Sequence, residues 1–293
     1  MKLSIIIVSY NTRKLLSDCL RLVYDSRIDF EYEVVVVDNG SEDGSVEMMK
    51  KKFKRVKVIE NKENLGFSRA NNQGMKEAKG DCLLLLNSDT RVSRDVIDKV
   101  ALFLERNNEV GVVGCKLLNE DGSLQYSVGY LPRLSKLFTW SLGVANLPLV
   151  RDIIKPYHAS YDGIYEKEKE VGWVTGAFFL LRKEVYERSG GFDEKVFMYV
   201  EEVEWCKRIW DLGYKIVYSP EGCVYHLKGA SGAGYEKVIE SEYIGLVYYF
   251  KKHKPSWEMP FLKIILYIDK HFKYLVYKLK GDKIKAIAYE KVS

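Results

Sequence analysis

The chain has 293 residues, of which 47% are hydrophobic and 30% are charged. This composition indicates a globular protein with one large domain, or a domain with an appendage, and it excludes a disordered or fibrous chain. The 46 Lys and Arg residues exceed the 41 Asp and Glu residues, so the formal net charge is +5.

Short apolar runs alternate with polar segments of helical period in the first part of the chain. This alternation predicts an α/β fold with a mostly parallel sheet that is buried on both faces. The predicted strands are 3–8, 34–37, 56–59, 83–86 and 110–113. The last of them completes an open α/β half of about 115 residues.

Helical spacing of apolar residues predicts the elements between these strands. A first helix follows Thr12, a suitable N-cap residue. Further helices are predicted over residues 45–53, 68–78 and 96–104.

The regular alternation ends after Gly122. Residues 130–170 are aromatic and charged, and they predict a loop-like insertion that is flexible or faces the substrate. A strand-like run over 173–181, a helix over 199–212 and a strand over 215–218 are predicted next. From Glu236 onward the pattern is helical, aromatic and basic.

Polar residues close the predicted strands, at the edge where open α/β sheets bind ligands. Asp38 follows four valines and suits hydrogen bonds from a nucleobase imide or ribose hydroxyls, although an Asx-turn with Gly40 explains it equally well. Asp89 follows another apolar run, where one carboxylate, water and substrate phosphates can hold Mg²⁺ or Mn²⁺. Capping of the helix that begins near Ser93 is the alternative for Asp89.

Three acidic residues cluster at the start of a predicted helix, namely Glu201, Glu202 and Glu204. Adjacent helical residues diverge by about 100°, so one acid can act as a general base while another binds substrate. Favourable interaction with the helix dipole is the alternative for all three.

Other candidates follow strand-like runs. His226 is suited to a structural hydrogen bond or to metal ligation. Trp173, Thr175 and Gly176 are explained by core or loop packing, although an exposed tryptophan is also a good platform for a sugar ring.

Taken together, these segments resemble the inverting glycosyltransferases of family 2, which have the GT-A fold, and especially their rhamnosyltransferase-like branch. The resemblance covers roughly residues 3–230, and its motifs occur in order along the chain. They are Val8-Ser9-Tyr10-Asn11, Val37-Asp38-Asn39-Gly40-Ser41, Asn64-Leu65-Gly66-Phe67, Asn71-Asn72-Gln73-Gly74, Leu86-Asn87-Ser88-Asp89, Trp173-Val174-Thr175-Gly176-Ala177, Gly190-Gly191-Phe192-Asp193-Glu194 and Glu201-Glu202-Val203-Glu204.

The resemblance implies a role for each motif. Asp89 and His226 would hold a divalent cation, Mn²⁺ or Mg²⁺, on the donor diphosphate, and Glu202 would be the catalytic base. The donor-binding residues would be Ser9, Tyr10, Asn11, Asp38, Asn64, Gly66, Arg69, Asn72, Asn87 and Ser88. The acceptor-binding residues would be Trp173, Thr175, Gly176 and Glu201.

Two positions depart from the family pattern. Asn87 stands where the metal motif often begins with aspartate, although the rhamnosyltransferase-like branch often has asparagine there. Glu202 stands where the base is usually aspartate, and its side chain is longer by one methylene. Glu201 and Glu204 therefore stay open as alternatives for the base.

The expected activity is metal-dependent, inverting transfer of a sugar, rhamnose included, from a UDP or dTDP donor. The acceptor would be a hydroxyl of a glycan or lipid-linked saccharide in cell-surface polysaccharide synthesis. A weakly active or non-catalytic glycan-binding scaffold of the same fold is one alternative. A sugar nucleotidyltransferase is another, but residues 9–14 lack the glycine-rich, basic triphosphate loop expected of that class.

The chain is expected to comprise a catalytic domain, 1–235, and a helical C-terminal region, 236–293. The donor half of the domain is about 1–115 and the acceptor half about 116–235. The catalytic domain has 34 basic and 34 acidic side chains and the C-terminal region 12 and 7, so the whole excess charge lies in the tail. A neutral body argues against nucleic acid as a partner.

Residues 261–285 of the tail mix large apolar residues with lysines. This pattern is typical of a basic amphipathic helix on an anionic membrane surface. A helix that packs on the catalytic body, or on a second copy in a homodimer, is the alternative.

Cellular location is predicted from cysteines and apolar segments. Five scattered cysteines without a CxxC pair indicate reduced thiols. No run approaches the roughly 18 to 20 apolar residues of a membrane span, and the N-terminus reads as a strand rather than a signal peptide. We therefore expect a cytoplasmic protein, or one that is peripheral on the inner face of the cytoplasmic membrane.

Overall fold

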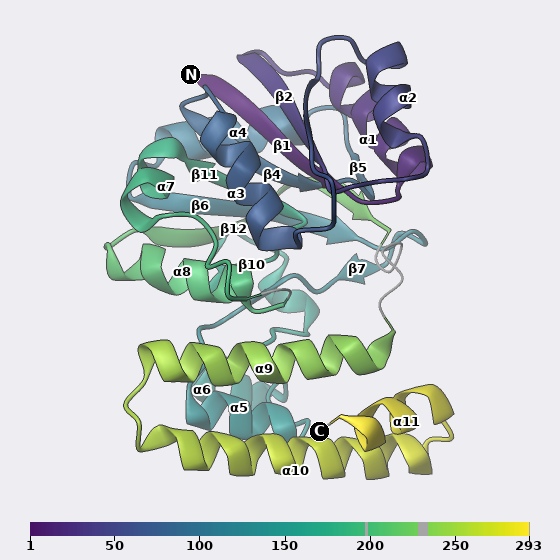
Figure 1. Cartoon of the computed structure of the whole chain (residues 1–293). Helices are drawn as coiled ribbons and strands as arrows, with labels where there is room; N and C mark the ends of the chain where they lie inside the picture. The colour runs from purple at the N-terminus through teal and green to yellow at the C-terminus, as the bar shows by residue number, and fades with distance from the viewer. Residues whose placement is uncertain (197–198, 228–233, 293) are drawn as a thin grey trace.

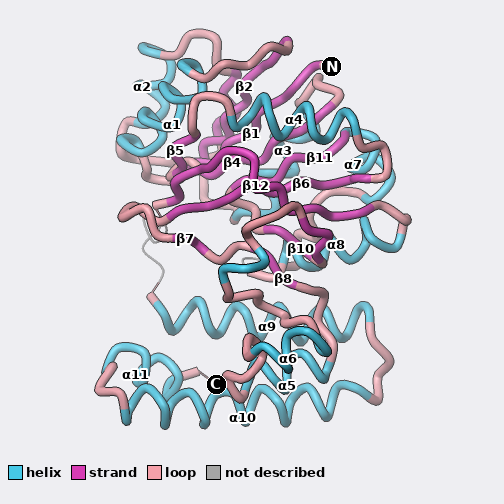
Figure 2. Tube along the Cα trace, turned by 180° about the vertical axis from the view of Figure 1, so that it is seen from behind, coloured by secondary structure: helices cyan, strands magenta, loops and turns pink. Residues whose placement is uncertain are grey.

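The computed structural model describes residues 1–196, 199–227 and 234–292. A large mixed sheet with helices on both faces forms the upper part of the molecule, and three C-terminal helices lie below it (Figures 1 and 2). The strands are β1 (Lys2–Ser9), β2 (Glu31–Asp38), β3 (Lys57–Glu60), β4 (Cys82–Asn87), β5 (Thr90–Val92), β6 (Val110–Leu118), β7 (Leu124–Gln125), β8 (Val128–Gly129), β9 (Lys169–Val171), β10 (Trp173–Val174), β11 (Phe178–Arg182) and β12 (Lys215–His226). The helices are α1 (Arg13–Asp25), α2 (Ser45–Lys52), α3 (Phe67–Glu77), α4 (Val96–Arg106), α5 (Leu134–Ser141), α6 (Pro148–Ile154), the 3₁₀ helix η1 (Asp162–Ile164), α7 (Lys183–Ser189), α8 (Glu201–Asp211), α9 (Tyr235–His253), α10 (Glu258–Leu279) and α11 (Lys283–Lys291).

The main sheet has the order β3-β2-β1-β4-β11-β6-β12-β5, with β7 beside β6 and β9 beside β12. Strands β1 to β4 are parallel, as the sequence predicts, and β11 lies antiparallel between β4 and β6. The register pairs Ser9 with Asp38 and Val8 with Asn87. The polar residues that follow three different strands therefore lie at one edge of the sheet.

Apolar side chains on both faces of this sheet explain why the strands read as continuous apolar runs. Ile5 and Ile7 face the core formed with α1 and α4, whereas Ile6 packs on the opposite face. All three are fully buried. Full burial of such a side chain contributes about 1.5 to 3 kcal/mol, so these central strands anchor the polar edge.

The predicted elements up to residue 113 are confirmed within one or two residues, except that β2 begins three residues before the predicted 34 and β6 continues to Leu118. The short strand β5 was not predicted. The single strand-like run predicted over 173–181 is two strands, β10 and β11, separated by residues 175–177. Strand β12 extends well beyond the predicted 215–218, through register shifts opposite β6.

The prediction of a loop-like insertion over residues 130–170 is wrong, because this segment contains α5, α6, η1 and β9. Leu137 of α5 is fully buried, and the side chain of Trp140 packs against the core. The helices are short, so they depend on packing partners that are remote in sequence.

The C-terminal region packs on the rest of the molecule. Apolar side chains of α9 and α10, including Leu246 and Leu262, belong to the same buried cluster as Trp173 and Val203. Helix α9 lies below α8, and helix α10 contacts α5 (Figure 1). Among the described residues, no helix combines the length and apolarity needed to cross a membrane.

Candidate active site

The donor half of the candidate site begins with Asp38, whose side chain is 1% exposed at the end of β2. Its Oδ1 accepts a hydrogen bond of 2.8 Å from the backbone N–H of Ser41, as expected of an Asx-turn. Its Oδ2 is also buried but has no partner among the described residues. A buried carboxylate oxygen without a donor is costly, so it is suited to a donor group on a ligand.

A chain of hydroxyl groups joins the ends of β1 and β4. Ser9 Oγ lies 2.9 Å from Thr12 Oγ1, which donates to Ser88 Oγ at 3.1 Å. Thr12 occupies the N-cap position of α1 but its side chain makes no capping bond. The hydroxyls instead tie the loop after β1 to the loop after β4.

The loop after β1 is shaped by Asn11, which has a positive φ of 53°. Asn11 Oδ1 accepts from the backbone N–H of Glu42, and its own N–H donates to Ser41 Oγ, both at 2.9 Å. Asparagine tolerates this backbone conformation better than most residues. Neighbouring Tyr10 is 46% exposed and presents its ring beside the same edge.

The other residues expected at the donor have partners within the protein. Asn64 Oδ1 accepts from Asn39 Nδ2 and from the N–H of Gly66, which has a φ of 84°. Arg69 pairs with Glu194 at 3.4 Å. Asn72 Nδ2 donates to the Phe192 carbonyl and to Glu194 Oε1, and Asn72 Oδ1 accepts from the N–H of Phe192. The Asn72 side chain therefore holds the loop that contains residues 192–194.

The predicted metal ligands are brought together. His226 Nε2 lies 3.3 Å from Asp89 Oδ1 and 3.3 Å from Asn87 Nδ2. Asp89 is not a helix cap, because α4 begins after Asp95. The capping alternative for Asp89 is thereby excluded.

The tautomer of His226 follows from Gln125, a residue that the sequence did not single out. Gln125 Nε2 donates to Asn119 Oδ1 at 2.8 Å and to the backbone carbonyl of His226 at 3.1 Å. Its Oε1 is then the acceptor for His226 Nδ1–H, at 2.7 Å. His226 Nε2 therefore carries a lone pair, which accepts from Asn87 Nδ2 and also lies 3.3 Å from Asp89 Oδ1.

This arrangement fits a divalent cation. A carboxylate oxygen and an imidazole lone pair that face each other repel unless a cation or a proton lies between them. Within the described part of the chain, no group of three or more His, Cys, Asp or Glu side chains could hold a metal. Asp89 and His226 would therefore share a cation with ligands from a substrate, as Mg²⁺ and Mn²⁺ sites commonly do.

Residues 175–177 connect this edge to the acidic cluster. The N–H of Asn87 donates to the carbonyl of Ala177 at 3.1 Å. The backbone amide of Gly176 is close enough to the Glu202 carboxyl to lower its pKa. Thr175 is partly exposed, and its N–H is bonded to Ser127.

Trp173 is a core residue. Its side chain is 6% exposed, and the indole N–H donates to the carbonyl of Tyr157 at 3.1 Å. The packing alternative therefore describes Trp173, and an exposed platform for a sugar ring does not.

Glu201 and Glu202 stand at the start of α8, after Tyr199 and Val200, which have positive φ values of 62° and 70°. A β-branched residue is strained in that conformation, so surrounding packing must hold it there. Oε2 of each glutamate is buried without a partner among the described residues. Burial and the neighbouring Glu202 raise the pKa of Glu201 well above its usual value.

The pKa of Glu202 is also raised by burial. The amide of Gly176 and the imidazole of His158 oppose the rise, and the carboxylate of Glu242 adds to it. Of the two buried glutamates, Glu202 is therefore the one whose carboxyl is acted on by Gly176, within residues 175–177.

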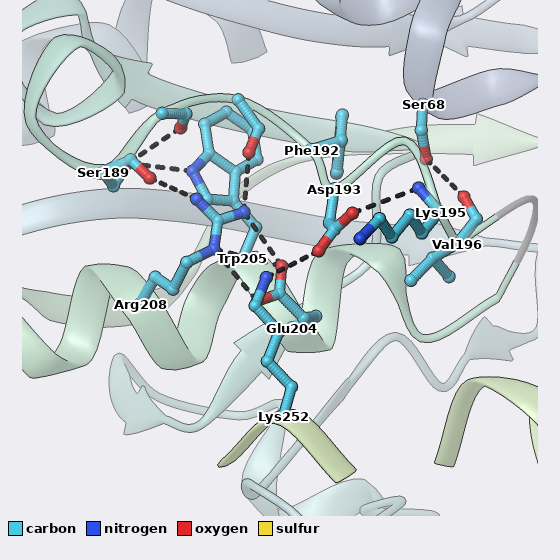
Figure 3. Close-up of polar contacts among 12 residues, drawn as sticks. Ser68, Ser189, Phe192, Asp193, Lys195, Val196, Glu204, Trp205, Arg208 and Lys252 are labelled. Atoms are coloured by element: carbon cyan, nitrogen blue, oxygen red, sulfur yellow. Dashed lines mark hydrogen bonds and ion pairs between the residues drawn. The ribbon is translucent and has the colours of Figure 1, made fainter. Parts of the chain in front are cut away.

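Glu204 is excluded as an alternative base, because it is fully buried in an ion-pair network (Figure 3). It accepts from Arg208, from His253 at 2.9 Å and from Lys252 at 2.8 Å. Burial would raise its pKa, but these hydrogen bonds and charges outweigh burial and lower the pKa to about 2. Lys252 also forms an ion pair with Asp193 at 2.6 Å. Because Lys252 and His253 belong to α9 and Glu204 to α8, these contacts hold α9 against α8.

The tail contributes a group close to the acidic cluster that the sequence reading missed. The carboxylate of Glu242, in α9, lies 2.6 Å from His158 Nε2, at hydrogen-bond distance. The His158 ring stands edge-on to Trp173 at a centroid distance of 5.3 Å. No sequence motif links residues 158 and 242, and only the folded chain brings them to Glu202.

Comparisons with known proteins agree with this geometry. A family model described as glycosyl transferase family 2 matches residues 4–190. An N-acetylglucosaminyl-diphospho-decaprenol L-rhamnosyltransferase of Mycobacterium tuberculosis is 28% identical over 211 residues, which are 68% of this chain and 67% of that protein. A dolichol-phosphate mannosyltransferase of Pyrococcus furiosus is 30% identical over 189 residues, which are 64% of this chain and 48% of the relative.

Among solved structures, a mannosyltransferase of Pyrobaculum calidifontis in complex with GDP-Man and Mn²⁺ superimposes with a TM-score of 0.59. The similarity covers 99% of this chain and 73% of that one at 18% identity, and it shows that the fold is GT-A. The family and the transferase class expected from the motifs are confirmed, and the mycobacterial relative carries the rhamnosyltransferase name. The chain therefore belongs to glycosyl transferase family 2.

Proposed function

We propose that this glycosyltransferase moves a sugar, rhamnose included, from a UDP or dTDP donor to a hydroxyl group, with inversion at the anomeric carbon and with a bound Mn²⁺ or Mg²⁺. The acceptor would be a glycan or a lipid-linked saccharide in cell-surface polysaccharide synthesis. The observation that supports this most strongly is the Asp89–His226 pair, at 3.3 Å, at the end of β4. Residues 175–177 join it to the buried carboxylate of Glu202.

Asp38 and the loop after β1 would hold the nucleoside. Asp38 Oδ2 can accept a hydrogen bond from a base imide or a ribose hydroxyl, because Ser41 occupies only Oδ1. Tyr10 would cover the base, while Ser9, Asn11 and Ser88 keep the two loops in place.

Asp89 and His226 would hold the divalent cation, and Asn87 would hydrogen bond to ribose or to cation-bound water. A cation bound there supplies positive charge against the charge that develops on the leaving diphosphate. Gln125 keeps the proton on His226 Nδ1, so that Nε2 stays available as a ligand.

Glu202 would act as the general base. The acceptor oxygen forms a bond to the anomeric carbon as the bond from that carbon to the diphosphate oxygen breaks, and the hydroxyl proton passes to Glu202. General-base assistance of this kind is typically worth about 10² to 10⁴-fold. The raised pKa makes the Glu202 carboxylate a better proton acceptor, and the neighbouring Glu201, whose pKa is raised as well, would hydrogen bond to the acceptor.

Two substitutions test the chemical step. Glu202→Gln should lower transfer by at least about 10²-fold and leave donor binding intact, whereas Asp89→Ala should weaken metal-dependent donor binding. Transfer is followed by nuclear magnetic resonance of the product, and donor binding by calorimetry with manganese. A Gln variant with wild-type turnover would show that Glu202 is not the base, and a product of retained configuration would exclude single displacement.

We also propose contact with an anionic membrane surface, through one face of α10. Five exposed apolar residues lie within one arc of this helix: Phe261, Ile264, Phe272, Leu275 and Leu279. Lys278 lies beside that arc, Lys263 and Lys270 lie roughly 100° or more around the helix from it, and Lys273 points inward, to Asp269 at 2.6 Å. A protein made in the cytoplasm would then work at the inner face of the membrane, where a lipid-linked acceptor is found.

The domain boundary at residue 235 stays a prediction. In this proposal the C-terminal region after it also supports the catalytic site. Lys252 and His253 of α9 bind Glu204, and Glu242 reaches the acidic cluster. Deleting the tail would therefore disturb the catalytic body, and the membrane and homodimer alternatives are better tested by point substitutions on α10.

A further inference from the structure

Four cationic side chains converge where three separate segments meet. Arg133 is the N-cap of α5, and Lys136 follows one turn later on the same side of that helix. Lys155 ends α6, and Lys254 ends α9. These segments lie together in the lower part of the molecule, below the main sheet (Figures 1 and 2). None of the four residues belongs to the candidate active site.

Two members of the cluster meet at the ring of Tyr130. The Nζ atoms of Lys136 and Lys155 lie 5.2 and 5.4 Å from the centroid of its ring, close enough for cation–π contact. Lys254 Nζ lies 6.0 Å from the ring of Phe250. Two ammonium groups from different helices thus share a single aromatic ring.

No carboxylate neutralises these charges. Within residues 1–196, 199–227 and 234–292, none of the four cationic groups forms an ion pair or donates a side-chain hydrogen bond. Other inward-facing lysines have such partners: Lys252 binds Asp193 and Glu204, and Lys273 binds Asp269. Asp211 and Glu258 act on Lys254 only through longer-range charge.

Lys136 is the strained member of the group. Burial, followed by the charges of Arg133, Lys155 and Lys254, lowers the pKa of its ammonium to about 8. A half-buried ammonium among three other cations is unfavourable unless an anion compensates it. Lys207 and Lys273, which are also half-buried, are paired with Asp211 and Asp269, whereas Lys136 has no such partner among the described residues. The cluster is therefore suited to an external anion.

We propose that Arg133, Lys136, Lys155 and Lys254 form a binding site for a phosphate-bearing anion. A phosphoryl group has the charge and the several acceptor oxygens that four convergent donors can use at once. The phosphate belongs either to a small soluble phosphate or to a lipid headgroup. Leu149 and Ile153 of the adjacent α6 are 81% and 82% exposed, which favours the headgroup.

The site is tested by thermal unfolding in the absence of divalent metal. Samples with inorganic pyrophosphate are compared with samples in sodium chloride of equal ionic strength. Pyrophosphate should raise the melting temperature of the wild-type protein. Lys136→Met should melt higher than wild type in the absence of phosphate, since an unpaired charge is removed, but should lose most of the pyrophosphate-dependent rise. Lys136→Arg should keep that rise. Lys167→Met removes an exposed lysine from the same part of the chain and should behave as wild type.

Vesicle sedimentation distinguishes the two sources of phosphate. With phosphatidylglycerol vesicles, a headgroup site requires that Lys136→Met and an Ile153→Ser variant both bind less than wild type and Lys167→Met. If only pyrophosphate binding depends on Lys136, the source is a soluble phosphate. A Lys136→Met variant that keeps both the pyrophosphate response and vesicle binding would overturn the proposal, as would a wild-type protein that responds to neither. These outcomes are independent of transfer activity, so they do not depend on the proposed base or metal.

Discussion

The two carboxylate oxygens of Asp38 lie in different surroundings. An Asx-turn and a ligand contact explained Asp38 equally well in the sequence, and the structure assigns the turn to Oδ1 while Oδ2 stays buried without a partner among the described residues. The sequence pattern does not show which carboxylate oxygen has a hydrogen-bond partner, because this depends on which backbone amides face each oxygen in the folded chain.

Glu204 should stabilise the fold through its charge. Its pKa, lowered from 4.5 to about 2, means that its contribution is present above pH 4.5 and is lost as the pH falls toward 2. Glu204→Gln should therefore lower the free energy of unfolding by on the order of 3 kcal/mol at pH 7, with the difference shrinking toward pH 2. Urea unfolding at several pH values measures this. The exposed pair of Glu77 with Lys57 supplies the control, since Glu77→Gln should change the free energy of unfolding much less than Glu204→Gln does.

Gln125 should tune the proposed metal site through the His226 tautomer. Gln125→Leu removes the acceptor from Nδ1–H, so manganese affinity should fall about 10 to 100-fold. Gln125→Glu keeps an acceptor there and should retain most of the affinity. Calorimetry in the presence of a nucleotide donor measures both variants. Wild-type affinity in the leucine variant would mean that the tautomer does not matter for the metal.

At the scale of elements, α9 fixes the start of α8. Gly245 of α9 lies against the strained turn before the acids, where an added Cβ would be 2.8 Å from Val200 Cβ and 2.9 Å from the Tyr199 carbonyl oxygen. The absence of a side chain thus lets the helix approach closely enough to hold Val200 in its positive φ. The position of Glu201 and Glu202 depends on a residue more than 40 positions away.

Gly245→Ala should separate α9 from this turn. We expect it to lower the free energy of unfolding by about 1 to 3 kcal/mol, through overpacking, and to reduce turnover further by displacing the acids. Melting temperature and turnover are compared with those of Gly163→Ala, whose added Cβ has no neighbour closer than 3.9 Å. If both variants behaved alike, close packing of α9 would not be what orders the acids.

The segment 130–170 illustrates why element prediction fails locally. Helices α5 and α6 have eight and seven residues, too short to be stable alone. Packing of α5 on α10 stabilises the first of them, and Lys273 of α10 lies 3.6 Å from the ring centroid of Trp140. Since that partner lies more than 120 residues away, local periodicity does not show it.

For the whole molecule, the membrane proposal predicts the effect of removing the exposed apolar arc of α10. Replacing Ile264, Leu275 and Leu279 with serine should reduce sedimentation with anionic vesicles and leave the melting temperature nearly unchanged, because these side chains are 52 to 78% exposed. Trp210→Ser removes an exposed apolar side chain from α8 and serves as the control.

Size-exclusion chromatography of the same variants examines the homodimer alternative. A wild-type dimer that dissociates in the triple variant would assign the α10 face to a second copy of the chain. Equal vesicle binding by the wild-type protein and the triple variant would remove this face from the membrane proposal.

The sequence by itself determined the parallel sheet and the polar residues at its edge, from Ser9 and Asp38 to Asn87 and Asp89. Apolar runs mark the strands, and parallel strands bring their carboxyl ends together whatever the rest of the chain does. The basic balance of the tail was also evident from composition alone.

Only the tertiary structure decided the roles of charged groups that are equivalent in the sequence. It paired Glu204 with residues of α9, left Glu202 beside Gly176, and turned Lys273 inward while Lys136 stayed without a counter-ion among the described residues. The physical reason is that the free energy of a buried charge depends on the donors and charges around it. In this chain those neighbours come from segments far apart in the sequence.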